Sequence, residues 1–253
     1  MDYLMMHKPD QRFIVPKIFQ DIPNLLAGVS TRHGGVSQSP YNSLNLGKHT
    51  SDSQKAIDQN LELLCNDLGI SVNQFARSYQ SHGADIWHTS IAGYQENYDA
   101  IIATNEGIIA GVGIADCCPI LLVDVQKKIT AAIHAGWKGT VAQIAQKTAF
   151  QFIHSYQSKP QDLRAWIGPC ISVNHFEVGD DVATHFADNE KTKVGQKYYV
   201  DLKKSNYNQL KSLGISAIEI SDYCTIEHNE HFFSHRKEKG ITGRMIAFVG
   251  FKI

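Results

Sequence analysis

Two apolar runs separated by a short polar turn occupy the middle of the stretch Ile114–Thr140. The first run, Ile120–Val125, is interrupted only by Asp124, and the second run is Ile129–Ile133. Short β-rich runs on either side of a polar turn are typical of a β-hairpin. The stretch therefore predicts an apolar two-stranded unit, around which the rest of the chain has to be arranged.

The predicted hairpin gathers reactive side chains at one of its ends. A hairpin centred near Lys127 pairs Ile120 with His134. Cys117 and Cys118 directly precede the first run, so we expect them just beyond the same end. A thiol and an imidazole at one rim of a sheet are the beginning of a reactive or metal-binding site.

The composition excludes several classes of protein. The chain has 253 residues, of which 43% are hydrophobic and 19% charged, as in an ordinary globular protein. A net charge of −1 gives no basic excess, so we expect no nucleic-acid partner. No apolar stretch has the length of a membrane span, and the N-terminus lacks the pattern of a secretion signal. Five cysteines without framework spacing favour reduced thiols in the cytoplasm.

Helical and strand patterns mix along the rest of the chain. Residues 1–24 predict an irregular segment, because three prolines prevent long regular structure. Residues 25–253 show no repeat and no change of composition that would mark a linker, so we expect one domain of mixed α and β structure. The patterns predict helices at 53–68, 140–153 and 202–213, a short helix within 176–186, and strands at 25–31, 75–79, 85–89, 107–115, 163–167, 198–201, 217–220, 232–234 and 245–251.

A third potential metal ligand follows the strand predicted at 75–79. His82 lies beside Gly83 at the end of that strand, so His82, Cys117 and His134 are three suitable groups at strand ends. Three protein ligands with one open position are typical of a catalytic metal site, and imidazole with thiolate favours zinc or copper. The paired Cys-x-x-Cys spacing of a structural zinc site is absent from the sequence.

The same residues also fit a site without metal. Cys117 could act as a nucleophile with His134 as its base, as in cysteine hydrolases. Such a site needs an acid or amide to orient the histidine, and Asp116 could supply it. A metal site instead needs a further ligand such as His82, and the sequence leaves both readings open.

Seven blocks in order give this chain a resemblance to a known family. They are VSTRHGGVSQSPYNSLNLGKH (29–49), QSHGADIW (80–87), ADCCPILL (115–122), HAGWKGT (134–140), IGPCI (167–171), FEVG (176–179) and FFSHRKEKGITGR (232–244). The sequence resembles the YfiH family, once called multicopper polyphenol oxidoreductases or laccases and now associated with purine nucleoside phosphorylase activity. The resemblance implies a single α+β domain over residues 25–253, a four-layer α-β-β-α arrangement with mixed sheets, and zinc bound by His82, Cys117 and His134.

The resemblance also implies an activity and a set of substrate contacts. The implied enzyme uses phosphate to cleave adenosine, inosine, guanosine or methylthioadenosine to free base and ribose 1-phosphate, and it deaminates adenosine. Candidates for binding phosphate or ribose are Arg32, Asn45, His49, Arg236 and Arg244. Lys138, Ser81 and His235 stand where the family usually has Arg, an aliphatic residue and Tyr, which affects the expected substrate contacts rather than the metal ligands. We expect a monomer or a small homo-oligomer.

Alternative functions remain within the same resemblance. Some bacterial relatives are tied to correction of peptidoglycan precursors, which would make this protein a hydrolase. A zinc-dependent interaction module is disfavoured, because an incomplete ligand set serves no purpose in a purely structural site. A copper-dependent polyphenol oxidase is also disfavoured, because the twelve histidines include no His-x-His pair.

Overall fold

The predicted hairpin forms the centre of a six-stranded sheet. In the computed structural model, which describes residues 11–253, β8 (Cys118–Asp124) pairs antiparallel with β9 (Ile129–Ala135). Every residue of both strands is buried. Sheets covered on both faces have such continuous apolar strands, which explains why the runs show no polar alternation.

The register of the hairpin differs by one residue from the prediction. Ile120 lies opposite Ile133, and His134 lies opposite Pro119 rather than Ile120. The turn is centred earlier because Asp124 belongs to β8, and its Oδ1 accepts hydrogen bonds from the backbone N–H groups of Gln126 and Lys127. His134 therefore lies one position nearer to the cysteines than predicted.

Two six-stranded sheets of mixed direction make up the body of the protein. Antiparallel and parallel pairs occur in both of them. In order across the first sheet, the strands are β1 (Phe13–Ile14), β2 (Leu25–Ser30), β15 (Met245–Phe251), β7 (Ile109–Ile114), β3 (Phe75–Tyr79) and β5 (Gly93–Glu96). In the second sheet the order is β14 (Ala217–Ile220), β10 (Leu163–Ile167), β8, β9, β6 (Ala100–Ala103) and β4 (Ile86–Thr89).

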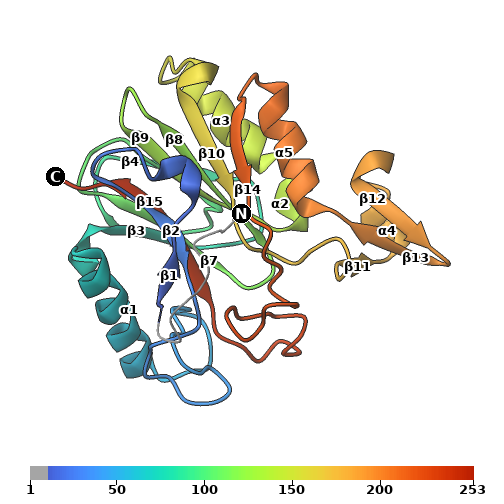
Figure 1. Ribbon diagram of the computed structural model, residues 1–253, viewed down its shortest axis with the longest axis horizontal. Coiled ribbons are helices and arrows are strands. Elements are labelled where there is room, and N and C mark those ends of the chain that lie inside the picture. The colour runs from blue at the N-terminus through green and yellow to red at the C-terminus, as the bar shows by residue number, and fades with distance from the viewer. Residues whose placement is uncertain (1–10) are drawn as a thin grey trace.

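Three apolar clusters define four layers. Leu61, Leu64 and Leu68 of α1 (Gln54–Leu68) pack on the first sheet. Side chains such as Val112 and Leu121 fill the space between the two sheets. The outer face of the second sheet packs against α3 (Ile144–His154) and α5 (Leu202–Ser212). The α-β-β-α arrangement expected from the resemblance is thus confirmed, and Figure 1 shows α1 on one side and α3 with α5 on the other.

A small third sheet projects from this body. It joins β11 (Glu177–Val178), β13 (Lys197–Val200) and β12 (Lys191–Val194) in that order, with α4 (Asp180–Ala183) beside it. Figure 1 shows this part extending away from α5. The remaining short helices are α2 (Trp137–Val141) and the 3-10 turns Lys17–Phe19, Val72–Gln74, Pro160–Asp162 and Asp188–Glu190.

Several predicted elements differ from the structure. The helix expected at 140–153 is two helices, α2 and α3, because Gln143 adopts a left-handed backbone with φ 61°. The strand expected at 232–234 does not form; instead Phe232 and Phe233 are buried in a loop. Within the N-terminal segment, residues 1–10 lie outside the described residues, and Phe13–Ile14 pair with β2. In the described chain, no helix combines the length and apolarity needed to cross a bilayer.

Candidate active site

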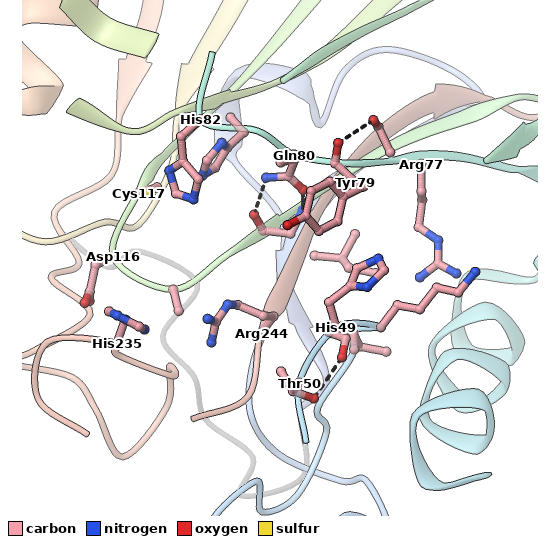
Figure 2. Close-up of a pocket in the computed structure, with 18 of the residues that line it drawn as sticks. His49, Thr50, Arg77, Tyr79, Gln80, His82, Asp116, Cys117, His235 and Arg244 are labelled. Atoms are coloured by element: carbon pink, nitrogen blue, oxygen red, sulfur yellow. Dashed lines mark hydrogen bonds between the residues drawn. The ribbon is translucent and has the colours of Figure 1, made fainter. Parts of the chain in front are cut away.

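The three predicted metal ligands meet where the two sheets come together. His82 lies between β3 of the first sheet and β4, Cys117 directly precedes β8, and His134 belongs to β9. Their ligand atoms all lie within 4.8 Å of one another. The two imidazole rings have centroids 4.8 Å apart and an interplanar angle of 80°. Figure 2 shows His82 and Cys117 at one end of a pocket.

A buried carboxylate, which the sequence reasoning missed, orients both histidines. Asp99 directly precedes β6 and is fully buried. Its Oδ1 accepts a hydrogen bond from His134 Nδ1 at 2.7 Å and another from the His82 backbone N–H at 3.0 Å. Its Oδ2 accepts from the Gly83 N–H at 2.7 Å. This hydrogen bond places a proton of His134 on Nδ1, so a metal would bind at Nε2, as it does where a carboxylate holds a metal-binding histidine.

Electrostatics favour a thiolate at Cys117. Burial disfavours its charge, but the attraction of His134 and the hydrogen bonds from both histidines lower the pKa of Cys117 to about 6. Burial likewise disfavours a charged His134, yet Cys117 and Asp99 raise the pKa of His134 to about 9. The thiolate is the form that binds metals and attacks electrophiles.

The three side chains form a group that could hold a metal ion. A Cβ built on Gly136, the residue before α2, would lie 3.1 Å from Cys117 Sγ and 3.1 Å from His82 Nδ1. Glycine thus leaves the ligand side chains free to close on an ion. Two imidazoles and one thiolate are donors that suit zinc or copper.

Asp116 does not take the role considered for it in a cysteine hydrolase. Its Oδ1 accepts a hydrogen bond from Thr225 Oγ1 and its Oδ2 accepts from the Arg236 N–H, each at 2.6 Å. Asp99 instead orients His134. Asp116 ties the loop that carries Arg236 to the cysteine turn.

The centre opens into a cavity of about 360 Å³ with a strongly cationic lining. Among the described residues that line it, Asp116 is the only acidic one. Outside the metal centre, the lining contains these basic and imidazole side chains: Lys48, His49, Arg77, His235, Arg236 and Arg244. The pocket is therefore suited to an anionic ligand.

Three of the five predicted substrate contacts line this pocket. His49 Nε2 lies 2.6 Å from the Tyr94 hydroxyl. Arg236 donates to the Glu177 carbonyl at 3.2 Å, and Arg244 donates to the carbonyls of Thr242 and Gly243. Burial lowers the pKa of Arg244 although the negative charges of Cys117 and Asp116 oppose the change.

The other two predicted contacts are not among the described residues that line the cavity. Arg32 forms an ion pair with Glu238 at 3.1 Å and donates to the Asn229 carbonyl. Asn45 is fully buried, and its Oδ1 accepts from the backbone N–H groups of Gly47 and Arg244. Arg32 holds loops together, and Asn45 positions the backbone of Arg244.

Other pocket residues were missed because their contacts are distant in the sequence. Gln80 exchanges two hydrogen bonds with the backbone of Gly113, at 2.7 and 2.8 Å, which joins the end of β3 to β7. Arg77 and Tyr94 lie on neighbouring strands. Two features of the sequence could have indicated these residues. Gln80 belongs to the QSHG block, and Asp99 directly precedes an apolar run.

A second group with metal-ligating side chains lies elsewhere in the described chain. His175, Cys224 and Glu227 also have ligand atoms within 4.8 Å of one another. Here, however, His175 Nε2 lies 3.0 Å from Glu227 Oε1, and Cys224 Sγ accepts from the Ser172 N–H at 3.3 Å. Unlike the centre at Cys117, this group is not among the described residues that line the cationic pocket.

The fold and the site together define the class of protein. It is a four-layer α+β protein with a His-Cys-His centre at one end of a cationic pocket. Within that class, the chain belongs to the family described as multi-copper polyphenol oxidoreductase laccase, whose model matches residues 26–252. The membership confirms the resemblance seen in the sequence.

Several relatives cover almost the whole chain. It is 35% identical over 237 residues to a purine nucleoside phosphorylase of Deinococcus radiodurans, covering 90% of each protein. It is 34% identical over 245 residues to the purine nucleoside phosphorylase YfiH of Escherichia coli, covering 94% of this chain and 98% of that protein.

Solved structures have the same fold. The crystal structure of YlmD from Geobacillus stearothermophilus matches with a TM-score of 0.88 and 30% identity, over 92% of this chain and 93% of that one. A YfiH protein of Bacillus licheniformis matches with a TM-score of 0.91 and 27% identity, over 97% and 98% of the two chains.

Proposed function

We propose that the protein is a zinc-dependent purine nucleoside phosphorylase. It would convert adenosine, inosine, guanosine or methylthioadenosine to the free base and ribose 1-phosphate, and it would also deaminate adenosine. The names of the similar proteins support the phosphorylase reaction. The observation that carries the proposal is the His-Cys-His centre, whose open side faces a pocket lined by arginines.

The residues near the centre suit the binding of phosphate. Bound zinc would supply a Lewis-acidic positive charge at this end of the pocket. Arg244 lies close enough for the charge of Cys117 to act on it, and Arg236 lines the same pocket. Planar guanidinium groups bind two phosphate oxygens at once, so this pair can hold phosphate beside the metal centre. Asp99 keeps His134 in the required tautomer throughout.

The apolar part of the lining suits the nucleoside. Leu46, Ile171, Phe176 and Ile246 contribute apolar surface that can cover a purine or a ribose ring. In phosphorolysis a phosphate oxygen forms a bond to C1′ while the bond from C1′ to the purine nitrogen breaks. The bonding electrons leave with the purine, which takes up a proton. A phosphate dianion close to C1′ stabilises the cation-like sugar of the transition state.

The experiment that tests this proposal is product analysis with purified protein. Adenosine, inosine, guanosine and methylthioadenosine are each incubated with and without phosphate, and free base, ribose 1-phosphate and ribose are quantified. We expect ribose 1-phosphate only when phosphate is present, and no turnover by His134→Ala. Arg244→Gln should mainly raise the KM for phosphate, because it removes a ligand-binding charge.

One outcome would replace the proposal. Free ribose formed at a rate indifferent to phosphate would make the enzyme a nucleoside hydrolase with water as the nucleophile. Inosine formed from adenosine measures the deaminase activity separately, so failure of one reaction leaves the other measurable.

A further inference from the structure

The pocket has a second cationic end, away from the metal centre. Figure 2 shows Arg77 at the opposite side of the pocket from His82 and Cys117. Arg77 belongs to β3, where it pairs with Tyr94 of β5 on one side and Gly111 of β7 on the other. Arg77, Tyr94 and Gly111 all line the pocket.

The guanidinium of Arg77 lacks a protein partner. It forms no hydrogen bond and no ion pair with any side chain or backbone group of residues 11–253. Arg12, Arg32 and Arg164, by contrast, each form an ion pair with a carboxylate. The charge of Asp58 acts on Arg77, but the Asp58 carboxylate accepts its hydrogen bond from Gln54 and not from Arg77.

Burial of this charge has a cost that the protein offsets only in part. Loss of solvent is the largest effect on Arg77 and lowers its pKa, against the opposing influence of Tyr94, Cys65 and Asp58. Arginine nevertheless stays charged at neutral pH. Partly buried charges are normally paired, so an unpaired guanidinium facing a cavity indicates that a ligand supplies the negative charge.

A lysine and a histidine lie at the same end. Lys48 Nζ lies 4.2 Å from the centre of the Tyr94 ring, and His49 Nε2 lies 2.6 Å from the Tyr94 hydroxyl. The acidic residue of the described lining, Asp116, is bound to Thr225 and Arg236 and lies away from Arg77 (Figure 2). This end of the pocket therefore carries positive charge without a neighbouring carboxylate in the lining.

We propose that Arg77, together with Lys48 and His49, forms a second phosphate-binding subsite at the end of the pocket distant from the metal centre. The guanidinium fork binds two phosphate oxygens, and the ammonium of Lys48 adds a point charge. The phosphate group has two sources: free inorganic phosphate, or the 5′-phosphate of a purine nucleotide whose base and sugar lie between the two ends. The second source rests on the proposed function, because it makes nucleoside 5′-monophosphates ligands of the same pocket.

Direct binding measurements test the subsite independently of catalysis. Inorganic phosphate, adenosine and adenosine 5′-monophosphate are titrated by calorimetry into Cys117→Ala protein, in which the metal centre is removed. The same titrations follow with Arg77→Gln and Arg77→Lys in that background. Arg164→Gln is the matched control, because Arg164 pairs with Asp21 outside the pocket. Thermal unfolding of each variant shows whether it is folded.

We expect Arg77→Gln to weaken phosphate-group binding about tenfold to a hundredfold, as loss of charge-assisted hydrogen bonds does. Arg77→Lys should retain part of the affinity, and Arg164→Gln should retain all of it. If adenosine 5′-monophosphate binds more tightly than adenosine, and Arg77→Gln removes this difference in affinity, the ligand carries the phosphate. If Arg77→Gln weakens the binding of inorganic phosphate alone, the subsite takes free phosphate. The proposal would be overturned if the Arg77→Gln variant bound each of the three ligands with the same affinity as its parent. This outcome does not depend on whether the enzyme is a phosphorylase.

Discussion

At the scale of single residues, one carboxylate organises the centre. Asp99 contacts the ring of His134 in β9 and the backbone of His82 in the connection between β3 and β4. The three candidate ligands could be selected from the sequence, because each stands beside a glycine or a predicted strand end. The role of Asp99 could not, since it depends on hydrogen bonds to residues 17 and 35 positions away.

Replacement of Asp99 by Asn preserves the shape of the side chain but removes its charge. We expect metal affinity to fall about tenfold to a hundredfold, as observed for partners of metal-binding histidines. Competition with a chromophoric chelator measures the affinity. Asp85→Asn, an exposed carboxylate nearby in the chain, should leave it unchanged. Equal affinity in Asp99→Asn and the parent would remove Asp99 from its assigned role.

The two adjacent cysteines should behave differently. Cys117 faces the centre, whereas Cys118 is fully buried in the apolar cluster beneath α3. We therefore expect Cys117→Ala to lose its zinc and Cys118→Ala to keep it. Elemental analysis of both variants, covering copper as well as zinc, measures this. Full zinc in the first variant and none in the second would show that the wrong ligand had been chosen.

At the scale of elements, local patterns predicted more than long-range pairing did. The hairpin follows from two apolar runs around a polar turn, and α1 and α5 follow from apolar periodicity; both are properties of neighbouring residues. β5, β6, β11 and β12 were not predicted, because their four or fewer residues carry little periodic signal. The third strand of the projecting sheet, β13, was predicted at 198–201 and lies at Lys197–Val200. The break between α2 and α3 was also missed, because a non-glycine residue, Gln143, adopts the left-handed conformation there.

The start of α2 provides a test of space at the centre. A methyl group on Gly136 would lie 3.1 Å from two ligand atoms, so Gly136→Ala should cause overpacking strain of about 1–3 kcal/mol. If the metal-bound state bears this strain, metal affinity falls about tenfold to a hundredfold. Chelator competition measures the change. Gly113→Ala is the control, because its Cβ would meet Gln80 Oε1 at an ordinary 3.4 Å. Unchanged affinity in Gly136→Ala would show that the ligands close elsewhere.

At the scale of the whole molecule, the centre joins the two sheets. His82 lies in the connection from β3 of the first sheet to β4 of the second, Cys117 lies in the connection from β7 to β8, and His134 belongs to β9 of the second sheet. A bound metal would therefore tie two connections between the sheets to a strand of the second sheet. The four-layer arrangement itself followed from the resemblance to a family and not from the residue pattern, because patterns show which faces are apolar but not how covered sheets are stacked.

Removal of the metal should lower the thermal stability of the whole domain. A ligand present at a hundred times its dissociation constant stabilises the folded state by about 2.7 kcal/mol. We expect a chelator to lower the Tm of the parent protein and to leave the Tm of Cys117→Ala unchanged. An equal effect of chelator on both proteins would place the responsible metal at another site, such as the group around Cys224.

Acid should release the metal. Ligand histidines must be neutral and the cysteine must be a thiolate, so protons compete with the ion for all three groups. Metal occupancy, measured by elemental analysis after dialysis across an acid titration, should fall together with activity. Activity lost while the metal stays fully bound would indicate a separate titrating acid or base.

The position of β15 has a consequence for how the protein folds during synthesis. β15 lies between β2 and β7, so the first sheet is divided into two unconnected parts until residue 251 has left the ribosome. Its pairing of Phe251 with Leu25 joins almost the ends of the described chain. Pairings of such sequence separation form slowly, because a large loop has to close first. The second sheet, whose last strand ends at Ile220, can be complete earlier, so the first sheet and the pocket built on it are the part that a chaperone would protect longest.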